Sequence, residues 1–349
     1  MDDGHMLNVF YMLLTVVVPL SLVVLGVVLS FGQGHDIKSK ARSAITLDTE
    51  HGLIKQGLLW LAIGCPLSLG VAFGLWAWSG YGLSLNAEGY KKFIEISILP
   101  LALMSISLPL AGLVSRFYST QQAAKQISIT MFKNNVDAYF SHRKGMLEYF
   151  SSLGEISYFD ICKFEYKAHL VLHKRFFKGS PEKGWPSMNE VSFGYIEENI
   201  KSAAELLITV LDGSSSNRLN DYLQASLKIY LAAQMLHIKE IIRDMAFKGV
   251  YVRWLNSEGG VLTQGVTTLE ALASIRFVRE YYNNFCDFSG RDRMKLSKDL
   301  EGVFLKTDCW LKKGKYIESI HAEEIVSLVE SGQAEYGEKH ADNIGGREF

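Results

Sequence analysis

The 349-residue sequence lacks the short motifs by which many enzymes are identified. It has no P-loop, no GxGxxG turn after a strand-like segment and no GxSxG nucleophile elbow. These absences exclude the usual nucleotide-binding and serine-hydrolase sites. We therefore expect a protein that is not an enzyme and that needs no cofactor.

Cysteine is scarce as well. The 4 cysteines are far apart in the sequence and form no CxxC pair: Cys65, Cys162, Cys286 and Cys309. This spacing argues against a disulfide framework and is typical of reduced thiols that serve as small buried apolar side chains.

Charge is missing from three long stretches in the first third of the chain. Met6–Gln33, Gln56–Ala87 and Ile96–Ser115 contain no Asp, Glu, Lys or Arg. Each is long enough to cross a bilayer core as a helix, which predicts spans at about 7–31, 57–79 and 96–116. A cleaved signal peptide is the alternative for the first stretch. The absence of Lys or Arg before it and of a small-residue cleavage site after it favours a retained span.

Asp, Glu, Lys, Arg and His are all absent from the three stretches. Ion-coupled transporters and proton pumps usually carry such groups near the bilayer midplane, so this class of protein is disfavoured. A pore in an oligomer, lined by Ser105, Ser107 and backbone groups, remains compatible with the sequence.

Basic residues outside the spans predict the orientation. The first loop carries Lys38, Lys40, Arg42 and Lys55, whereas the second carries only Lys91 and Lys92. The positive-inside rule then places the N-terminus outside and the C-terminal part in the cytoplasm. We expect a mainly α protein with a transmembrane region at 1–117, a stalk helix at 118–153, a helical cytoplasmic domain at 154–332 and a flexible tail at 333–349.

Small residues and prolines in the spans suggest how the helices pack. Gly70 and Gly74 form a GxxxG pair in the second span, and Pro100 and Pro109 interrupt the third. A GxxxG pair allows close helix contact within the chain or between copies, and we expect the spans to pack as a homo-oligomer through this small-residue face. The prolines fit ordinary kinked packing better than a gating hinge.

The third span runs into a long segment without proline, from Val114 to Phe150. Apolar residues recur at 3–4 spacing along it, which predicts one continuous helix with a seam for packing against partners. Such a stalk either transmits movement or only tethers the domain. The residues expected at this interface are Ile129, Phe132, Asn135, Val136 and Tyr139, and the seam continues through Met146 and Phe150.

Two polar groups beyond the stalk are candidate sites. Cys162, Glu165, His169 and His173 recur at spacings of 3, 4 and 4, and these are ligand types that zinc accepts. Four ligands along one straight helix cannot converge on one ion, so a polar helix face is the better interpretation. Lys174, Arg175 and Lys178 alternate with Phe176 and Phe177. This pattern makes the three basic residues candidates for contact with nucleic acid or anionic lipid.

Helical periodicity continues through the rest of the chain. It predicts one helix ending at Gly213, a second from Tyr222 to Phe247 and a third from Val266 to Phe285. A short strand is expected near Gly249–Leu255.

Two segments, Gln126–Phe150 and His169–Gly184, resemble the membrane effector proteins of bacterial retrons and related abortive-infection membrane proteins of phage defence. The resemblance rests on Asn134, Asn135, Tyr139, His142 and the Leu172–Phe177 segment. It implies an effector in the bacterial inner membrane, silenced by a reverse transcriptase with its RNA-linked DNA. The alternative is a membrane-anchored scaffold or sensor whose cytoplasmic domain binds a partner.

Overall fold

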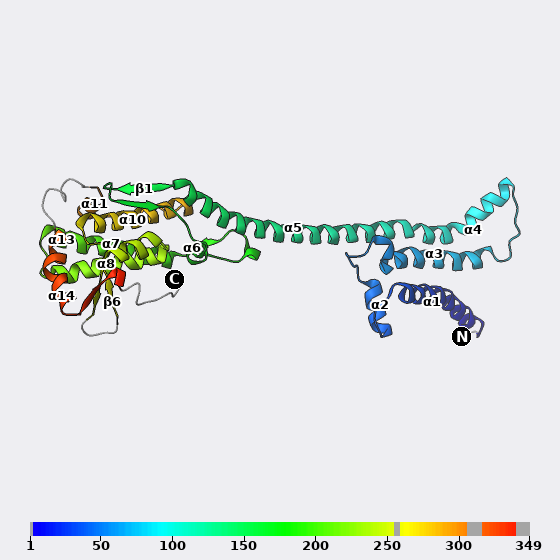
Figure 1. Cartoon of the computed structure of the whole chain (residues 1–349). Coiled ribbons are helices and arrows are strands. Elements are labelled where there is room, and N and C mark those ends of the chain that lie inside the picture. Colours follow the sequence, from blue (N-terminus) through cyan, green and yellow to red (C-terminus); the bar gives the residue numbers. More distant parts are fainter. Residues whose placement is uncertain (1–2, 255–258, 306–315, 340–349) are drawn as a thin grey trace. The chain divides into compact units, whose positions relative to one another are not determined.

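The computed structural model describes residues 3–254, 259–305 and 316–339 (Figure 1). The chain forms two compact units, Met1–Met131 and Phe132–Phe349. The division falls inside one long helix, α5 (Ser107–Leu153). The boundary expected at 153 coincides with the end of α5. The boundary expected at 117 lies inside α5, where the sequence changes from apolar to polar.

The first unit is a group of apolar helices. α3 (Gly57–Trp78) packs against α1 (Asp3–Phe31) on one side and α4 (Ala87–Ser105) on another, and α2 (Ile37–Ile45) lies against α1. The segments long and apolar enough to cross a membrane are Val9–Phe31, Gly57–Trp78 and the stretch Ala87–Leu153 formed by α4 and α5. The prediction of three N-terminal spans, the third leading into a helical domain, is confirmed.

A single non-helical residue, Ile106, separates α4 from α5. Pro109 has no backbone N–H, so the carbonyl of Ser105 loses its usual helical partner. At the same break, the Ser107 hydroxyl donates a 2.6 Å hydrogen bond to the neighbouring carbonyl, that of Met104. Pro109 thus lies in the first turn of α5, where a missing donor costs least.

The second unit has a helical core. Its main helices are α7 (Glu190–Asp212), α8 (Arg218–Leu236) and α10 (Thr268–Ser289). α7 ends where expected, because Gly213 adopts the left-handed conformation that closes a helix. Phe150 of α5 joins this core, its ring centroid 4.7 Å from that of Tyr281. The end of the long helix is therefore part of the folded domain.

Short strands flank these helices. β1 (Glu155–Tyr158) and β2 (Cys162–Glu165) form one antiparallel hairpin, β3 (Phe177–Lys178) and β4 (Ser187–Met188) another. A third antiparallel sheet has the order β6-β5-β7, in which Val252 pairs with Val261 and Ala334. The strand expected near 249–255 is thus present as β5. The bounds of this sheet are Val250–Arg253 (β5), Gly260–Leu262 (β6) and Ala334–Tyr336 (β7).

The remaining elements are short. They are η1 (Leu53–Lys55), α6 (Leu170–Phe176), η2 (Pro181–Lys183), α9 (Ala246–Lys248), α11 (Lys298–Leu305), α13 (Tyr316–Ile320), α14 (Val326–Glu330) and two π-helical segments, η3 (Glu240–Met245) and η4 (His321–Ile325).

Two sequence expectations need correction. The helix expected from Tyr222 to Phe247 ends at Leu236, because His237 takes the left-handed conformation and closes it. The tail expected to be flexible from residue 333 begins with β7, which is held by main-chain pairing to β5. Residues 340–349 of that tail lie outside the described part of the chain.

Candidate functional site: the two anchorages of α5

The N-terminal part of α5 is fastened to the loop between α2 and α3. The Tyr118 hydroxyl donates a 2.6 Å hydrogen bond to the His51 carbonyl. About two turns further along, Lys125 Nζ lies 3.1 Å from Glu50 Oε1. Both contacts lie within the first unit, and together they hold this part of α5 against the loop.

This loop has internal bonds of its own. The buried Gln56 donates from Nε2 to the Asp48 carbonyl at 2.6 Å and accepts the Asp48 N–H at 2.9 Å. The Glu50 backbone N–H and the His51 ring lower the pKa of Asp48. The loop therefore presents its partners for α5 in an ordered arrangement.

The C-terminal part of α5 has a second anchorage, built around two buried histidines. His142 of α5 and His173 of α6 face each other, with Nδ1 of the first 3.0 Å from Nε2 of the second. Aromatic rings surround them, including Phe177, whose centroid is 4.5 Å from that of His142, and Trp185, at 4.7 Å. One imidazole donates and the other accepts, so this contact requires at least one neutral ring.

Burial lowers the pKa of both histidines. For His173 the pKa falls to about 4, chiefly through burial and further through His142 and Arg143. For His142 burial lowers the pKa. Burial thus favours the neutral form of both rings, and the pair acts as a structural contact between α5 and α6.

The β3–β4 hairpin completes this anchorage. Asn135 Nδ2 donates a 2.8 Å hydrogen bond to the Glu182 carbonyl. Gly184 has a φ of 84°, and a Cβ there would lie 2.9 Å from Asn135 Oδ1, so glycine is needed for the close approach. The ring of Trp185, in the loop of this hairpin, packs against His142, although Trp185 remains 70% exposed.

The seam predicted along α5 is buried only at its C-terminal end. Met146 and Phe150 are fully buried, whereas Val136 and Tyr139 are half-buried. Ile129 and Phe132 are exposed, as is every residue from Ser119 to Asn134. The structure therefore joins Asn135, Val136 and Tyr139 to the domain and leaves the first two interface residues uncovered.

The glycine pair in α3 is covered by the same chain. A Cβ on Gly70 would lie 2.4 Å from Met104 Cγ and 2.8 Å from the Pro100 carbonyl, and Gly74 lies under the ring of Trp78. Pro100 is buried in this contact between α3 and α4. The small-residue face that was predicted to join copies is therefore covered by side chains of the same chain.

The four zinc-type residues do not share a helix face. Cys162 and Glu165 belong to strand β2, where the first is buried and the second exposed, and His169 is the N-cap of α6. His173 points to His142 instead. Within the described ranges, no group of three or more potential metal ligands comes together. The helical expectation is wrong because a turn and a strand occupy this segment.

The basic cluster is also divided by the fold. Arg175 Nη1 donates to the carbonyls of Gln234, at 2.8 Å, and Met235, at the C-terminus of α8. Phe176 and Phe177 are buried in the core and cannot stack on a base. Lys174 and Lys178 remain exposed and are the two members still accessible to an anionic partner.

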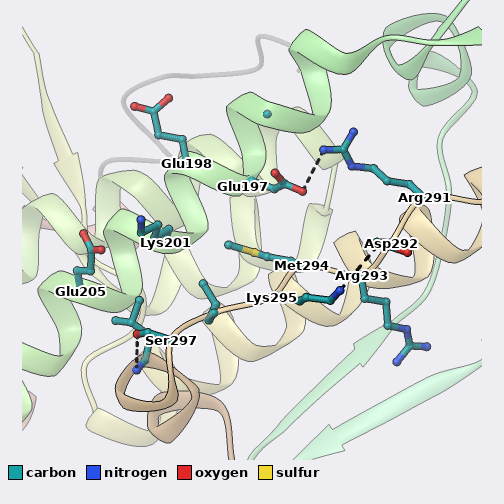
Figure 2. Close-up of a pocket in the computed structure, with 13 residues that line it drawn as sticks. Glu197, Glu198, Lys201, Glu205, Arg291, Asp292, Arg293, Met294, Lys295 and Ser297 are labelled. Carbon is teal, nitrogen blue, oxygen red and sulfur yellow. Dashed lines mark hydrogen bonds and ion pairs between the residues drawn. The ribbon is translucent and has the colours of Figure 1, made fainter.

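A groove of about 1020 Å³ lies between α7 and the segment that joins α10 to α11 (Figure 2). α7 contributes Glu197, Glu198, Lys201 and Glu205, and the opposite wall carries the alternating charges of residues 291–295. Arg291 pairs with Glu190 and, at 3.4 Å, with Glu197. The 13 residues that line the groove include no cysteine, so it offers no thiol nucleophile, and its charged side chains suit binding of a charged surface.

Sequence reasoning missed the contacts that hold α5. Tyr118 and His51 are 67 residues apart, and His142 and His173 are 31 apart, so no local pattern connects them. A signal for the second pair was present, since His142 falls on the inward side of the seam with Met146. Comparisons with known proteins identify no relative: no family model, no curated protein and no solved structure matches the chain.

Proposed function

We propose that the protein is a membrane-embedded effector, without enzymatic activity, that perturbs a bilayer when its C-terminal domain is released from restraint. The observation that carries this proposal is α5, one helix from Ser107 to Leu153 that belongs to a candidate span at one end and to the domain core at the other. A continuous helix resists bending, so a change in the domain is carried along it rather than absorbed by a linker.

The two anchorages support the same proposal. Tyr118 and Lys125 attach α5 to the loop between α2 and α3, and Asn135 and His142 attach it to the domain. Between them, no described residue of α5 is buried. Rotation or tilt of α5 would therefore change contacts at both ends without first dislodging other elements.

The biological setting is the more specific part of the proposal. The positive-inside rule supports an N-terminus outside the bacterial inner membrane and a domain in the cytoplasm. The resemblance to retron and abortive-infection effectors supports a role in phage defence, with a reverse transcriptase and its RNA-linked DNA as the restraint. We also propose that copies of the chain form a homo-oligomer in the bilayer.

Controlled expression of the full chain in bacteria tests the effector role. We expect a membrane-potential dye to report depolarisation soon after induction, before growth stops. The Tyr118→Phe variant, which lacks the bond to the loop, serves to test coupling, and Tyr90→Phe, at an exposed tyrosine, serves as the matched control. Induction that leaves both potential and growth unchanged, with protein present in the membrane, contradicts the proposal.

A second candidate is a membrane-anchored scaffold or sensor without toxic action, and the groove beside α7 favours it. Lys201, Glu198 and Glu205 line this groove, and their side chains form no salt bridge with another described residue. They are available to a partner protein. A scaffold leaves the membrane potential intact on induction, so the same measurement separates the two candidates.

A further inference from the structure

We infer that the exposed part of the α5 seam binds the same surface of a second copy of this chain, side by side and in register. The surface consists of Gln122, Lys125, Ile129 and Phe132, and is called the free seam below. This inference rests on the membrane insertion that the proposed function includes. It needs no effector action.

The apolar part of the free seam, Ile129 and Phe132, is not covered by any other described part of the chain. Ile129 and Phe132 are each 55% exposed, and neither contributes to either buried core cluster. A lone helical stretch of this length is marginally stable in water, and β-branched residues such as Ile127, Ile129 and Thr130 reduce its stability further. Burial against another helix would remove the exposed apolar area and stabilise the stretch.

The position of the free seam indicates what covers it. It continues, at the same 3–4 spacing, into Val136, Tyr139 and Met146, which the chain covers itself. It also lies on the same helix, α5, whose N-terminal part belongs to the third apolar stretch, Ala87–Leu153. Two copies inserted in one bilayer necessarily hold α5 parallel and at equal depth, so residue 129 of one faces residue 129 of the other.

The polar residues of the free seam are compatible with an identical residue facing them from a second copy. Two lysines at one level would repel each other, but each Lys125 has a carboxylate of its own chain, Glu50, at 3.1 Å. Gln122 carries both a donor and an acceptor, so it bonds to an identical amide opposite. Polar residues at seam positions weaken association and fix the register, as they do in coiled coils.

The free seam is accessible to a second copy, whereas the small-residue face of the second span is not. Gly70 packs against Pro100 and Met104 of its own chain, and Gly74 against its own Trp78. The small-residue face is therefore already occupied. Two apolar levels, Ile129 and Phe132, are few for association in solution, but confinement to a membrane raises the effective concentration of the partner.

Two isoleucines provide a matched experiment. Ile127 is 60% exposed and Ile129 is 55% exposed. They are two positions apart in the sequence, which places them about 200° apart around the helix axis. Single variants Ile129→Cys and Ile127→Cys in the full chain are treated in native membranes with a short bismaleimide. The parent chain gives the background from the native cysteines.

The expected result is a dimer of the chain at least fivefold more abundant for Ile129→Cys than for Ile127→Cys. Adding Phe132→Asp to Ile129→Cys should remove this dimer, whereas Met131→Asp, at an exposed residue outside the free seam, should leave it. Equal dimer from both cysteines, no dimer, or an adduct with another protein overturns the inference. A chain that alkaline carbonate extracts from the membrane overturns the proposed function as well.

Discussion

His142 and His173 meet in the protein interior, with 3.0 Å between Nδ1 of the first and Nε2 of the second. The pair joins the long helix to α6 and is enclosed by aromatic rings. An uncharged pair is compatible with this environment. A doubly protonated pair has no acceptor left for the shared hydrogen bond, and its charge would be buried.

Acidification should therefore loosen the attachment of α5 to the domain. The ordinary histidine pKa is 6.5, and for His173 it falls to about 4 in the folded protein. Between these values the unfolded chain binds more protons, so the free energy of unfolding falls as pH falls from 6.5 toward 4. One such group contributes at most about 1.4 kcal/mol per pH unit. Denaturant unfolding of the full chain in detergent at pH 7.5, 6 and 5 measures this dependence.

The control is the double variant His142→Phe/His173→Leu, which removes both titrating groups. Its stability should vary less with pH than that of the parent. Some dependence will remain, because burial also lowers the pKa of His237 and of His321, the latter to about 4. An unaltered pH profile in the double variant would show that the pair does not titrate on unfolding.

Arg175 should prove structural rather than a contact for nucleic acid or lipid. Arg175→Ala removes the donor to the carbonyls of Gln234 and Met235 at the end of α8. Hydrogen bonds from a charged donor are worth about 1.5–3 kcal/mol, so thermal unfolding should shift to lower temperature. Lys174→Ala and Lys178→Ala, at exposed positions, should leave the unfolding temperature nearly unchanged. Comparable losses in all three variants would contradict this assignment.

Gly70 should be sensitive to the smallest possible enlargement. A Cβ at this position would meet Met104 and the Pro100 carbonyl well inside normal contact distance. Gly70→Ala should therefore push α3 and α4 apart at a cost of about 1–3 kcal/mol, as overpacking does elsewhere. Gly26→Ala in α1 is the matched control, because nothing lies within 4 Å of its added Cβ. Resistance to unfolding in detergent compares the two, and equal behaviour would show that the α3–α4 contact adapts freely.

The sequence contained the main elements of the fold but not the contacts that join them. Uncharged stretches predicted the spans, and the absence of proline between Val114 and Phe150 predicted the long helix, because both patterns depend only on residues close together in the sequence. Cys162 and His173 were placed on one helix face by spacing alone. Phe159 and Asp160 adopt positive φ values there and turn the chain into a hairpin instead. Arg175 looked like part of a binding cluster because its carbonyl partners lie 59 and 60 residues away.

The continuity of α5 provides the final prediction. Inserting Gly-Gly after Lys125 adds two poor helix formers, each costing about 1 kcal/mol, at a point where no neighbouring residue is buried. The insertion also rotates the following residues by about 200° relative to the span. We expect the spans and the domain to remain folded, as unfolding of each in detergent would show. Membrane depolarisation on induction should fall to the level of uninduced cells.

A seven-residue helical insertion at the same point is the control. It preserves helix continuity and changes the rotation of the following residues about the helix axis by only about 20°. Depolarisation should therefore be retained, although the domain then lies about 10 Å further along the helix axis. If both insertions depolarise membranes as the parent does, α5 is only a tether. If both abolish the effect, the distance between the anchorages matters more than the stiffness of the helix that connects them.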